Sequence, residues 1–273
     1  EFRAMVQALH AAGLRVGMDV VYNHTTASGQ SDRSVLDRVV PGYYHRLNGA
    51  GEIERSTCCE NTATENRMMG KLMIDSVKLW ATQYRIDSFR FDLMGHQPRA
   101  VMEQLRDEVS AAAGRPIQLI GEGWNFGEVA NGARFVQASQ LSLNGSGIGT
   151  FSDRARDHVR GGSGFDGGVS LLRNQGYING MHYDDNGSGG NKSRNDLMWS
   201  ADVIKVGLAG SIRDYVMTTH WDATLRLEQI DYNGQPAGYV VDPQEVVNYV
   251  ENHDNWTLLD NNAFKLPNAT SRE

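Results

Sequence analysis

The 273-residue sequence has only two cysteines, and they are adjacent, Cys58 and Cys59. A disulfide framework needs several spaced cysteines, and a metal site needs more ligands than this pair offers. No histidine flanks the pair closely in the sequence, so no metal site is predicted. The sequence leaves two possibilities for the pair: a disulfide between the neighbouring cysteines, or two free thiols in a loop.

The sequence also lacks a run of 18 apolar residues and an excess of positive charge. Nothing in it is therefore predicted to span a membrane. The net charge is −7, from 26 basic and 33 acidic residues, which argues against nucleic acid or an anionic membrane as the main partner. A neutral polysaccharide is compatible with this charge. Hydrophobic content of 40% and charged content of 22% are ordinary for a soluble globular protein.

The chain opens without methionine, inside what reads as a helix over residues 1–12. Its apolar residues recur at helical spacing, and Gly13 stands where a glycine commonly ends a helix. We therefore expect the sequence to be a piece of a longer polypeptide.

Buried strands are predicted at residues 14–22, 85–92 and 117–122, with helices between them. The pattern βαβαβ with right-handed crossovers predicts an α/β fold with a parallel sheet. A glycine-rich excursion follows over residues 160–195. Beyond it we expect a helical stretch near residues 200–206, another buried strand at 246–253, and a tail at 266–273 without regular structure.

The helix after the first strand is predicted to begin at a capping box formed by Thr62 and Glu65. An apolar stripe along it at spacings of three and four indicates a core-facing side. The stripe consists of Met69, Met73, Val77, Trp80 and Tyr84. The next helix follows Pro98 and ends near Gly114.

Polar residues gather where the four clearest strands end. They are Asn23 and His24, Arg90 and Asp92, Glu122, and His253 and Asp254. Active sites of α/β barrels and doubly wound sheets lie at the carboxyl edge of the strands, so this edge is the candidate site.

Side chains alternate faces along a strand, so Arg90 and Asp92 share one face while Phe89 and Phe91 share the other. The ion pair is predicted to lie inside and the rings to face the helices. A guanidinium beside Asp92 would keep it ionised, as a nucleophile requires. Glu122 follows a run of apolar residues, and an apolar pocket would favour its protonated form. Two carboxyl groups in contrasted surroundings are typical of glycoside hydrolysis.

Four segments resemble the ordered signature segments of the alpha-amylase superfamily. They are residues 19–24 (DVVYNH), 89–96 (FRFDLMGH), 121–124 (GEGW) and 249–255 (YVENHDN). The second and third are similar to the pullulanase branch of that family. So are residues 148–162 (IGTFSDRARDHVRGG) and 228–234 (EQIDYNG).

The resemblance implies that Asp92 is the nucleophile that forms a glycosyl-enzyme. It implies that Glu122 is the general acid and then the base, and that Arg90 orients Asp92. Asp254 would grip the sugar hydroxyls and help to distort the ring.

The remaining site residues implied by the resemblance bind substrate. His24 and His253 would hydrogen-bond the sugar at the cleavage point, and Trp124 would offer it an apolar face. The sequence does not decide whether Asp19 has a structural role or faces the substrate.

The resemblance also implies that residues 1–273 form an incomplete catalytic domain, a partial (β/α)8 TIM barrel with strands three to seven. The first two strands would precede Glu1, the eighth strand would follow Glu273, and the accessory domains would lie outside these residues. Inward apolar residues would then face water through the open side of the barrel. Met18, Val20 and Ile120 are expected among them.

The implied function is retaining hydrolysis of α-1,6-glucosidic branches in pullulan, amylopectin, glycogen and limit dextrins. An isoamylase, alpha-amylase or branching enzyme of the same superfamily is an alternative, as is a non-catalytic barrel that only binds. Such non-catalytic relatives typically lose the carboxylates that this sequence keeps. The family implies an α-glucan partner, a monomer, an extracellular or cell-surface place in a bacterium, and no cofactor for the chemistry. Structural Ca²⁺ stays open.

Overall fold

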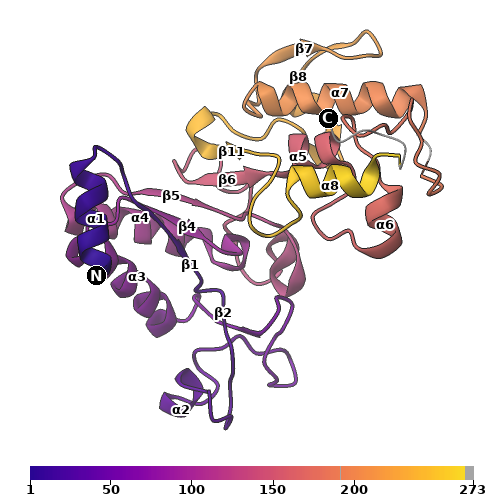
Figure 1. Cartoon of the computed structure of the whole chain (residues 1–273). Helices are drawn as coiled ribbons and strands as arrows, with labels where there is room; N and C mark the ends of the chain where they lie inside the picture. Colours follow the sequence, from indigo (N-terminus) through magenta and orange to yellow (C-terminus); the bar gives the residue numbers. More distant parts are fainter. Residues whose placement is uncertain (191, 268–273) are drawn as a thin grey trace. The chain divides into compact units, whose positions relative to one another are not determined.

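A computed structural model describes residues 1–190 and 192–267 of the chain (Figure 1). Residue 191, within the glycine-rich excursion, and residues 268–273, most of the predicted tail, lie outside the described residues. The chain divides into two compact units, Glu1–Thr150 and Phe151–Glu273.

A parallel sheet forms the centre of the first unit and carries the predicted βαβαβ pattern. Helix α3 (Arg67–Gln83) lies between the first and second strands of this sheet along the chain, and α4 (Arg99–Ala113) lies between the second and third. The strands of the sheet lie in the order β1-β4-β5-β6, and neighbouring strands pair in parallel. These four are β1 (Gly17–Val20), β4 (Ser88–Phe91), β5 (Gln118–Gly121) and β6 (Gly149–Ser152). The prediction of an α/β fold with a parallel sheet is confirmed.

The two faces of the sheet differ as strand parity predicts. Phe89 and Phe91 are 0% and 1% exposed and pack in the core of the first unit. Burying such rings is worth roughly 1.5–3 kcal/mol each, which fixes the register of β4. Val20 also lies in this core, with Met18 packed against it. The expectation that Met18 and Val20 point inward is therefore wrong: in β1 it is Asp19, paired with Arg90, that occupies the polar face.

The helices of the first unit confirm the predicted apolar stripes but not the predicted start of α3. Met69, Met73 and Val77 are at most 2% exposed. The capping residue of α3 is Asn66, so the Thr62–Glu65 capping box is wrong. Its two members bond elsewhere, because Thr62 donates to the carbonyl of Tyr22 and Glu65 pairs with Arg46. The other elements here are α1 (Phe2–Ala11), α2 (Leu36–Val39), β2 (His24–Thr25) and β3 (Glu60–Asn61).

The second unit is built largely from helices around a smaller core. The predicted stretch near residue 200 belongs to a longer helix, α7 (Arg194–Leu208), which Ser193 caps. The predicted strand 246–253 is wrong in its second half, because β11 covers only Val246–Asn248. The remaining elements are α5 (Asp153–Arg160), α6 (Gly168–Arg173), α8 (Leu258–Lys265), the hairpin β7 (Val216–Thr218) and β8 (Thr224–Arg226), and the pair β9 (Asp231–Tyr232) and β10 (Gln235–Pro236).

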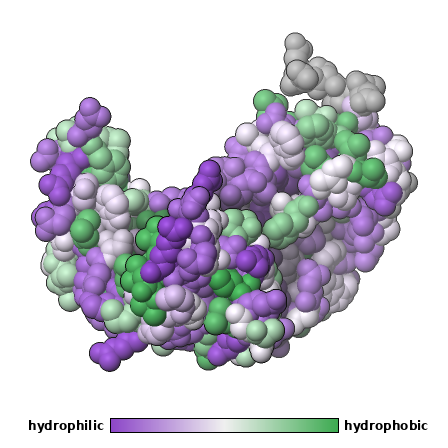
Figure 2. Space-filling model, turned by 90° about the horizontal axis from the view of Figure 1, so that it is seen from below, coloured by the Kyte–Doolittle hydropathy of each residue, from purple (hydrophilic) through white to green (hydrophobic). Residues whose placement is uncertain are grey.

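The surface carries both hydrophobic and hydrophilic residues. Figure 2 shows hydrophobic residues grouped among hydrophilic ones on the visible face. Large apolar side chains are exposed in both units, for example Val35, Val39 and Phe165. Within the described ranges, every helix is too short or too polar to cross a lipid bilayer.

Candidate active site

A single guanidinium gathers three carboxylates on the polar face of the first unit's sheet. The side chain of Arg90 is 11% exposed, and its Nη1 lies 2.9 Å from Asp19 Oδ1 and 3.2 Å from Asp92 Oδ1. Its Nη2 lies 3.0 Å from Glu122 Oε1. The strand register explains this grouping, because Asp19 pairs with Arg90 and the chain reaches Asp92 and Glu122 just after β4 and β5. These four predicted site residues are therefore brought together.

The second oxygen of Asp92 is held by a residue to which the sequence analysis gave no role. Asn23 donates from Nδ2 to Asp92 Oδ2 at 2.8 Å and to the Asp92 carbonyl at 2.7 Å. It is fully buried. Its own Oδ1 contacts Nδ1 of His24, so Asn23 links His24 to Asp92. The only sign of this role in the sequence is that Asn23 directly precedes His24 in the DVVYNH segment.

Glu122 does not lie in the apolar pocket that the sequence predicted. Its side chain is buried, but Oε1 faces Arg90 and Oε2 accepts from the backbone N–H of Leu93 at 2.9 Å. Both neighbours favour the carboxylate over the acid. The contrast between an Arg-paired Asp92 and an apolar-flanked Glu122 is therefore wrong, because the two share Arg90.

Unusual backbone packing supports these contacts. Leu93, which donates to Glu122, has φ 38° and ψ 48°, a left-handed conformation that costs a non-glycine residue of order 1–3 kcal/mol. At Gly95 a Cβ would stand 2.2 Å from the carbonyl oxygen of Trp124. Only glycine permits this approach, which places half-buried Trp124 beside the segment that follows Asp92.

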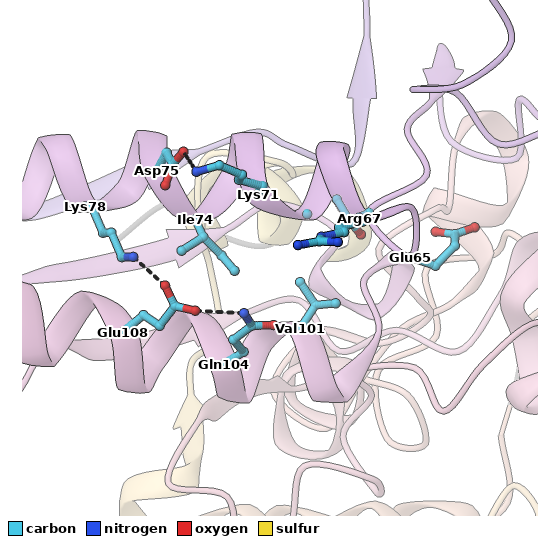
Figure 3. Close-up of a pocket in the computed structure, with 11 residues that line it drawn as sticks. Glu65, Arg67, Lys71, Ile74, Asp75, Lys78, Val101, Gln104 and Glu108 are labelled. Atoms are coloured by element: carbon cyan, nitrogen blue, oxygen red, sulfur yellow. Dashed lines mark hydrogen bonds and ion pairs between the residues drawn. The ribbon is translucent and has the colours of Figure 1, made fainter.

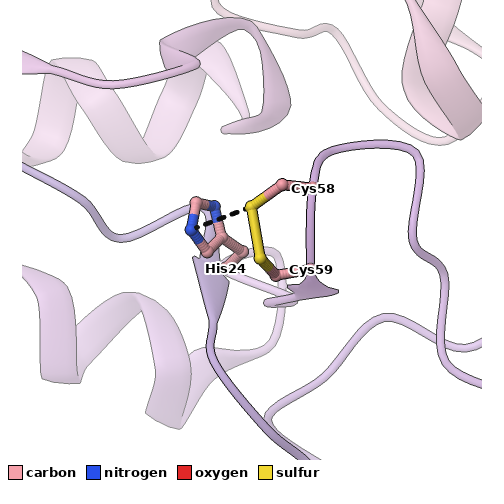
Figure 4. A group of neighbouring side chains, drawn as sticks. All are labelled: His24, Cys58 and Cys59. Carbon is pink, nitrogen blue, oxygen red and sulfur yellow. Dashed lines mark hydrogen bonds between the residues drawn. A yellow bond between two sulfur atoms is a disulfide. The ribbon is translucent and has the colours of Figure 1, made fainter.

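The two cysteines form a disulfide next to His24 (Figure 4). Sγ of Cys58 lies 3.6 Å from Nε2 of His24. Folding thus brings a histidine to the pair, which the sequence did not indicate, and these three residues could form a metal-ligand cluster. Metal ligation needs thiolates, and here both sulfurs are bonded to each other.

A buried polar network fixes the loop that carries the disulfide. Glu128 accepts from Arg46 at 2.7 Å, from Asn61 at 3.0 Å and from the hydroxyl of Ser56. Burial raises the pKa of Glu128, but these bonds outweigh it and lower the pKa to about 2. Burial lowers the pKa of His96, which contacts Ser56, to about 4, so its ring is neutral at pH 7. No sequence motif indicated this network.

A pocket of about 380 Å³ between α3 and α4 is a weaker candidate (Figure 3). Its charged groups largely satisfy one another: Lys71 pairs with Asp75 and Lys78 with Glu108, which also accepts from Gln104. Lys78 and Gln104 lower the pKa of Glu108. Such pairs are typical of a solvated helix surface.

The second unit carries the other two predicted residues on the loop between β11 and α8. The side chains of His253 and Asp254 are 64% and 43% exposed, with His253 Nε2 3.3 Å from Asp254 Oδ1. Both line a pocket of about 340 Å³ whose wall includes Arg160, Asp166 and Trp256.

Known proteins resemble the chain over nearly its whole length. It is 47% identical to a pullulanase of Klebsiella pneumoniae over 268 residues, which covers 97% of this chain and 24% of that protein. It is 44% identical to pullulanase 1, chloroplastic, of Arabidopsis thaliana, over 98% of this chain and 28% of that protein. The chain thus spans about a quarter of the length of these curated relatives. No family model matches it.

Solved structures give the same result. PulA of Klebsiella pneumoniae in complex with maltotriose superposes with a TM-score of 0.91 at 47% identity, covering 97% of this chain and 28% of that one. PulA of Klebsiella oxytoca has a TM-score of 0.91 at 46% identity, covering 98% and 25%. The chain is therefore a homologue of the pullulanases and corresponds to a part of these larger proteins.

Proposed function

We propose that the protein containing this chain is a retaining, pullulanase-type glycoside hydrolase. It would cleave α-1,6-glucosidic branches in pullulan, amylopectin, glycogen and limit dextrins. The observation that carries the proposal is that Asp92 and Glu122 lie on the two terminal nitrogens of one guanidinium, that of Arg90. A retaining mechanism needs the two carboxyl groups about 5–5.5 Å apart, and a shared guanidinium holds both near one point of the sheet edge. The maltotriose complex of a homologue supports the choice of substrate.

In the first step, Asp92 attacks the anomeric carbon while Glu122 protonates the leaving oxygen. Arg90 and Asn23 each bind one oxygen of Asp92, which holds the nucleophile in a single orientation. The negative charge of Asp92 nearby favours a proton on Glu122, because like charges disfavour each other.

In the second step, Glu122 must act as a base towards water. Once Asp92 has become a neutral ester, Arg90 keeps its attraction for Glu122 and the repulsion from Asp92 is gone. The shared guanidinium therefore favours the carboxylate of Glu122 when the mechanism needs it.

The family resemblance supplies the remaining roles. His24, His253 and Asp254 would bind the sugar at the cleavage point and Trp124 would contact a ring near the branch. The chain would then be part of a (β/α)8 barrel, from its third to its seventh strand. The proposed enzyme is bacterial, secreted and monomeric, and its chemistry needs no cofactor. Whether it binds structural Ca²⁺ stays open.

The test is incubation of the parent protein, meaning the polypeptide that contains residues 1–273, with pullulan and separately with linear amylose. A debranching enzyme should release maltotriose from pullulan and leave amylose intact. Cleavage of amylose alone would indicate an amylase, and cleavage of neither would contradict a hydrolytic function.

A further inference from the structure

The loop that carries His253 and Asp254 is exposed, yet it would have to hold a carboxylate in place against a sugar. Both side chains are more than two-fifths exposed, so packing alone fixes neither. Active-site groups need positions defined to about 0.5 Å, which requires support from residues behind them. The second unit contains one side chain that provides such support from both ends of the loop.

That side chain is Arg160, the last residue of α5. Its Nη1 donates to the carbonyl of Val250 at 3.2 Å, and its Nη2 donates to the carbonyl of Trp256 at 2.8 Å. These carbonyls stand three residues before and three residues after His253. One planar guanidinium therefore ties together the two ends of the loop and fixes the distance between them.

Arg160 is not committed to an ion pair. It is 6% exposed, and no carboxylate of the described residues lies within ion-pair distance of it. Burying a guanidinium is costly unless it is hydrogen-bonded, and its partners here are the two loop carbonyls. The chain nevertheless places it there, with its hydrogen-bonding capacity directed at the loop and its side chain in the wall of the pocket that Asp254 lines.

The backbone of Arg160 is itself held by two buried side chains. Its carbonyl accepts from Nζ of Lys265 and from Nδ2 of Asn179, each at 2.9 Å. Lys265 belongs to α8, the helix that begins directly after the loop. One turn earlier on α5, Arg156 donates to the hydroxyl of Tyr249. The start of the loop is thus attached to the same helix face.

We propose that Arg160 is a positioning residue for Asp254. This proposal rests on the proposed function, because it gives Arg160 a part in that reaction. Arg160 closes the 250–256 loop and so sets the position of Asp254 against the sugar in the transition state. The fork of the guanidinium is required, since a lysine ammonium lacks the planar geometry that reaches both carbonyls. The inference also gives a role to the last arginine of the 148–162 segment.

The experiment measures kcat and KM on pullulan in the parent protein for Arg160→Ala and Arg160→Lys. A misplacement of about 1 Å can cost on the order of 100-fold in rate, so we expect kcat to fall by roughly that factor in both variants. KM should change less than kcat, because the contact of Asp254 with the sugar matters most when the ring is distorted in the transition state. Adding guanidinium chloride at millimolar concentration should restore part of the activity of Arg160→Ala, whereas ammonium chloride should not. Arg173→Ala, at an exposed arginine of α6, should behave as wild type.

Three results would overturn the inference. They are a kcat within about threefold of wild type in either variant, a lost activity that guanidinium does not restore, and failure of both variants to fold, which would make Arg160 a stability residue. An unmodified parent that is inactive on pullulan would instead contradict the proposed function. An active parent with an insensitive Arg160→Ala would contradict only the role of Arg160.

Discussion

Lys265 allows a quantitative prediction about pH and stability. Its side chain is 0% exposed, and its ammonium donates to the carbonyls of Arg160 and Gly161. Burial lowers the pKa of Lys265 to about 8 from 10.5, with Asp166 opposing this and Arg160 adding to it. Between these two pKa values the unfolded chain binds more protons than the folded one, so stability should rise with pH in that window.

The magnitude follows from the size of the pKa shift. One pKa unit corresponds to about 1.4 kcal/mol. The difference between about 8 and 10.5 therefore corresponds to roughly 3 kcal/mol of unfolding free energy. Most of it, roughly 2–3 kcal/mol, should be gained between pH 7 and pH 10. Lys265→Met keeps the apolar stem and removes the titrating group, so the variant should lack this gain.

The assay unfolds the wild-type parent protein and its Lys265→Met variant with denaturant at four pH values from 7 to 10. Tryptophan fluorescence reports the unfolding. Taking the difference between the two proteins cancels the titration of all other groups. Wild type should gain roughly 2–3 kcal/mol on the variant over this range. Lys71→Met, at a lysine that is 58% exposed, should follow the wild-type curve. Parallel curves for wild type and Lys265→Met would refute the reasoning.

Four further predictions concern the candidate site of the first unit. NMR of fresh product should show the α-anomer first, since retention needs the two carboxyl groups about 5–5.5 Å apart; initial β-anomer would rule it out. Asp92→Asn should abolish the covalent glycosyl-enzyme seen by mass spectrometry. Glu122→Gln should spare substrates with activated leaving groups, and equal loss on all substrates would count against an acid role. Arg90→Met should lower the unfolding free energy by about 3 kcal/mol, because it removes the ion-pair partner of buried Glu122 and of partly exposed Asp92. Asp19→Asn, at a side chain that is 49% exposed, should cost at most about 1 kcal/mol, and equal losses in the two variants would contradict this ranking.

The sequence predicted best those elements whose burial follows an apolar period. The α3 stripe and the alternation through Phe89, Arg90 and Phe91 were sufficient to predict a core helix and the polar face of the sheet. The same alternation places Asp19 on the polar face and Val20 in the core. The error at Val20 came from assigning inward residues without applying this parity to β1.

Helix α5 was missed because its buried face is not apolar. Its inward side chains are Arg154, Arg156 and Arg160, which are at most 9% exposed. Arg154 stacks on the rings of Tyr232 and Tyr239 and donates to carbonyls, so its burial depends on partners far along the chain. A hydrophobic pattern cannot show such a helix, because the residues it buries are those that the pattern assigns to solvent.

The same limit applies to the candidate site. Motif spacing placed Asp92 and Glu122 at neighbouring strand ends, but the state of a carboxyl group depends on what its oxygens contact. Those contacts come from Asn23, Leu93 and Arg90, and each of the three comes from another strand or strand end than the carboxyl group it binds. The apolar residues that flank Glu122 in the sequence are therefore a poor guide to its surroundings, because in a parallel sheet a side chain at a strand end also faces the adjacent strand, where Arg90 lies. The charge state of a carboxyl group at a strand end can therefore be assigned only when the register of the neighbouring strands is known.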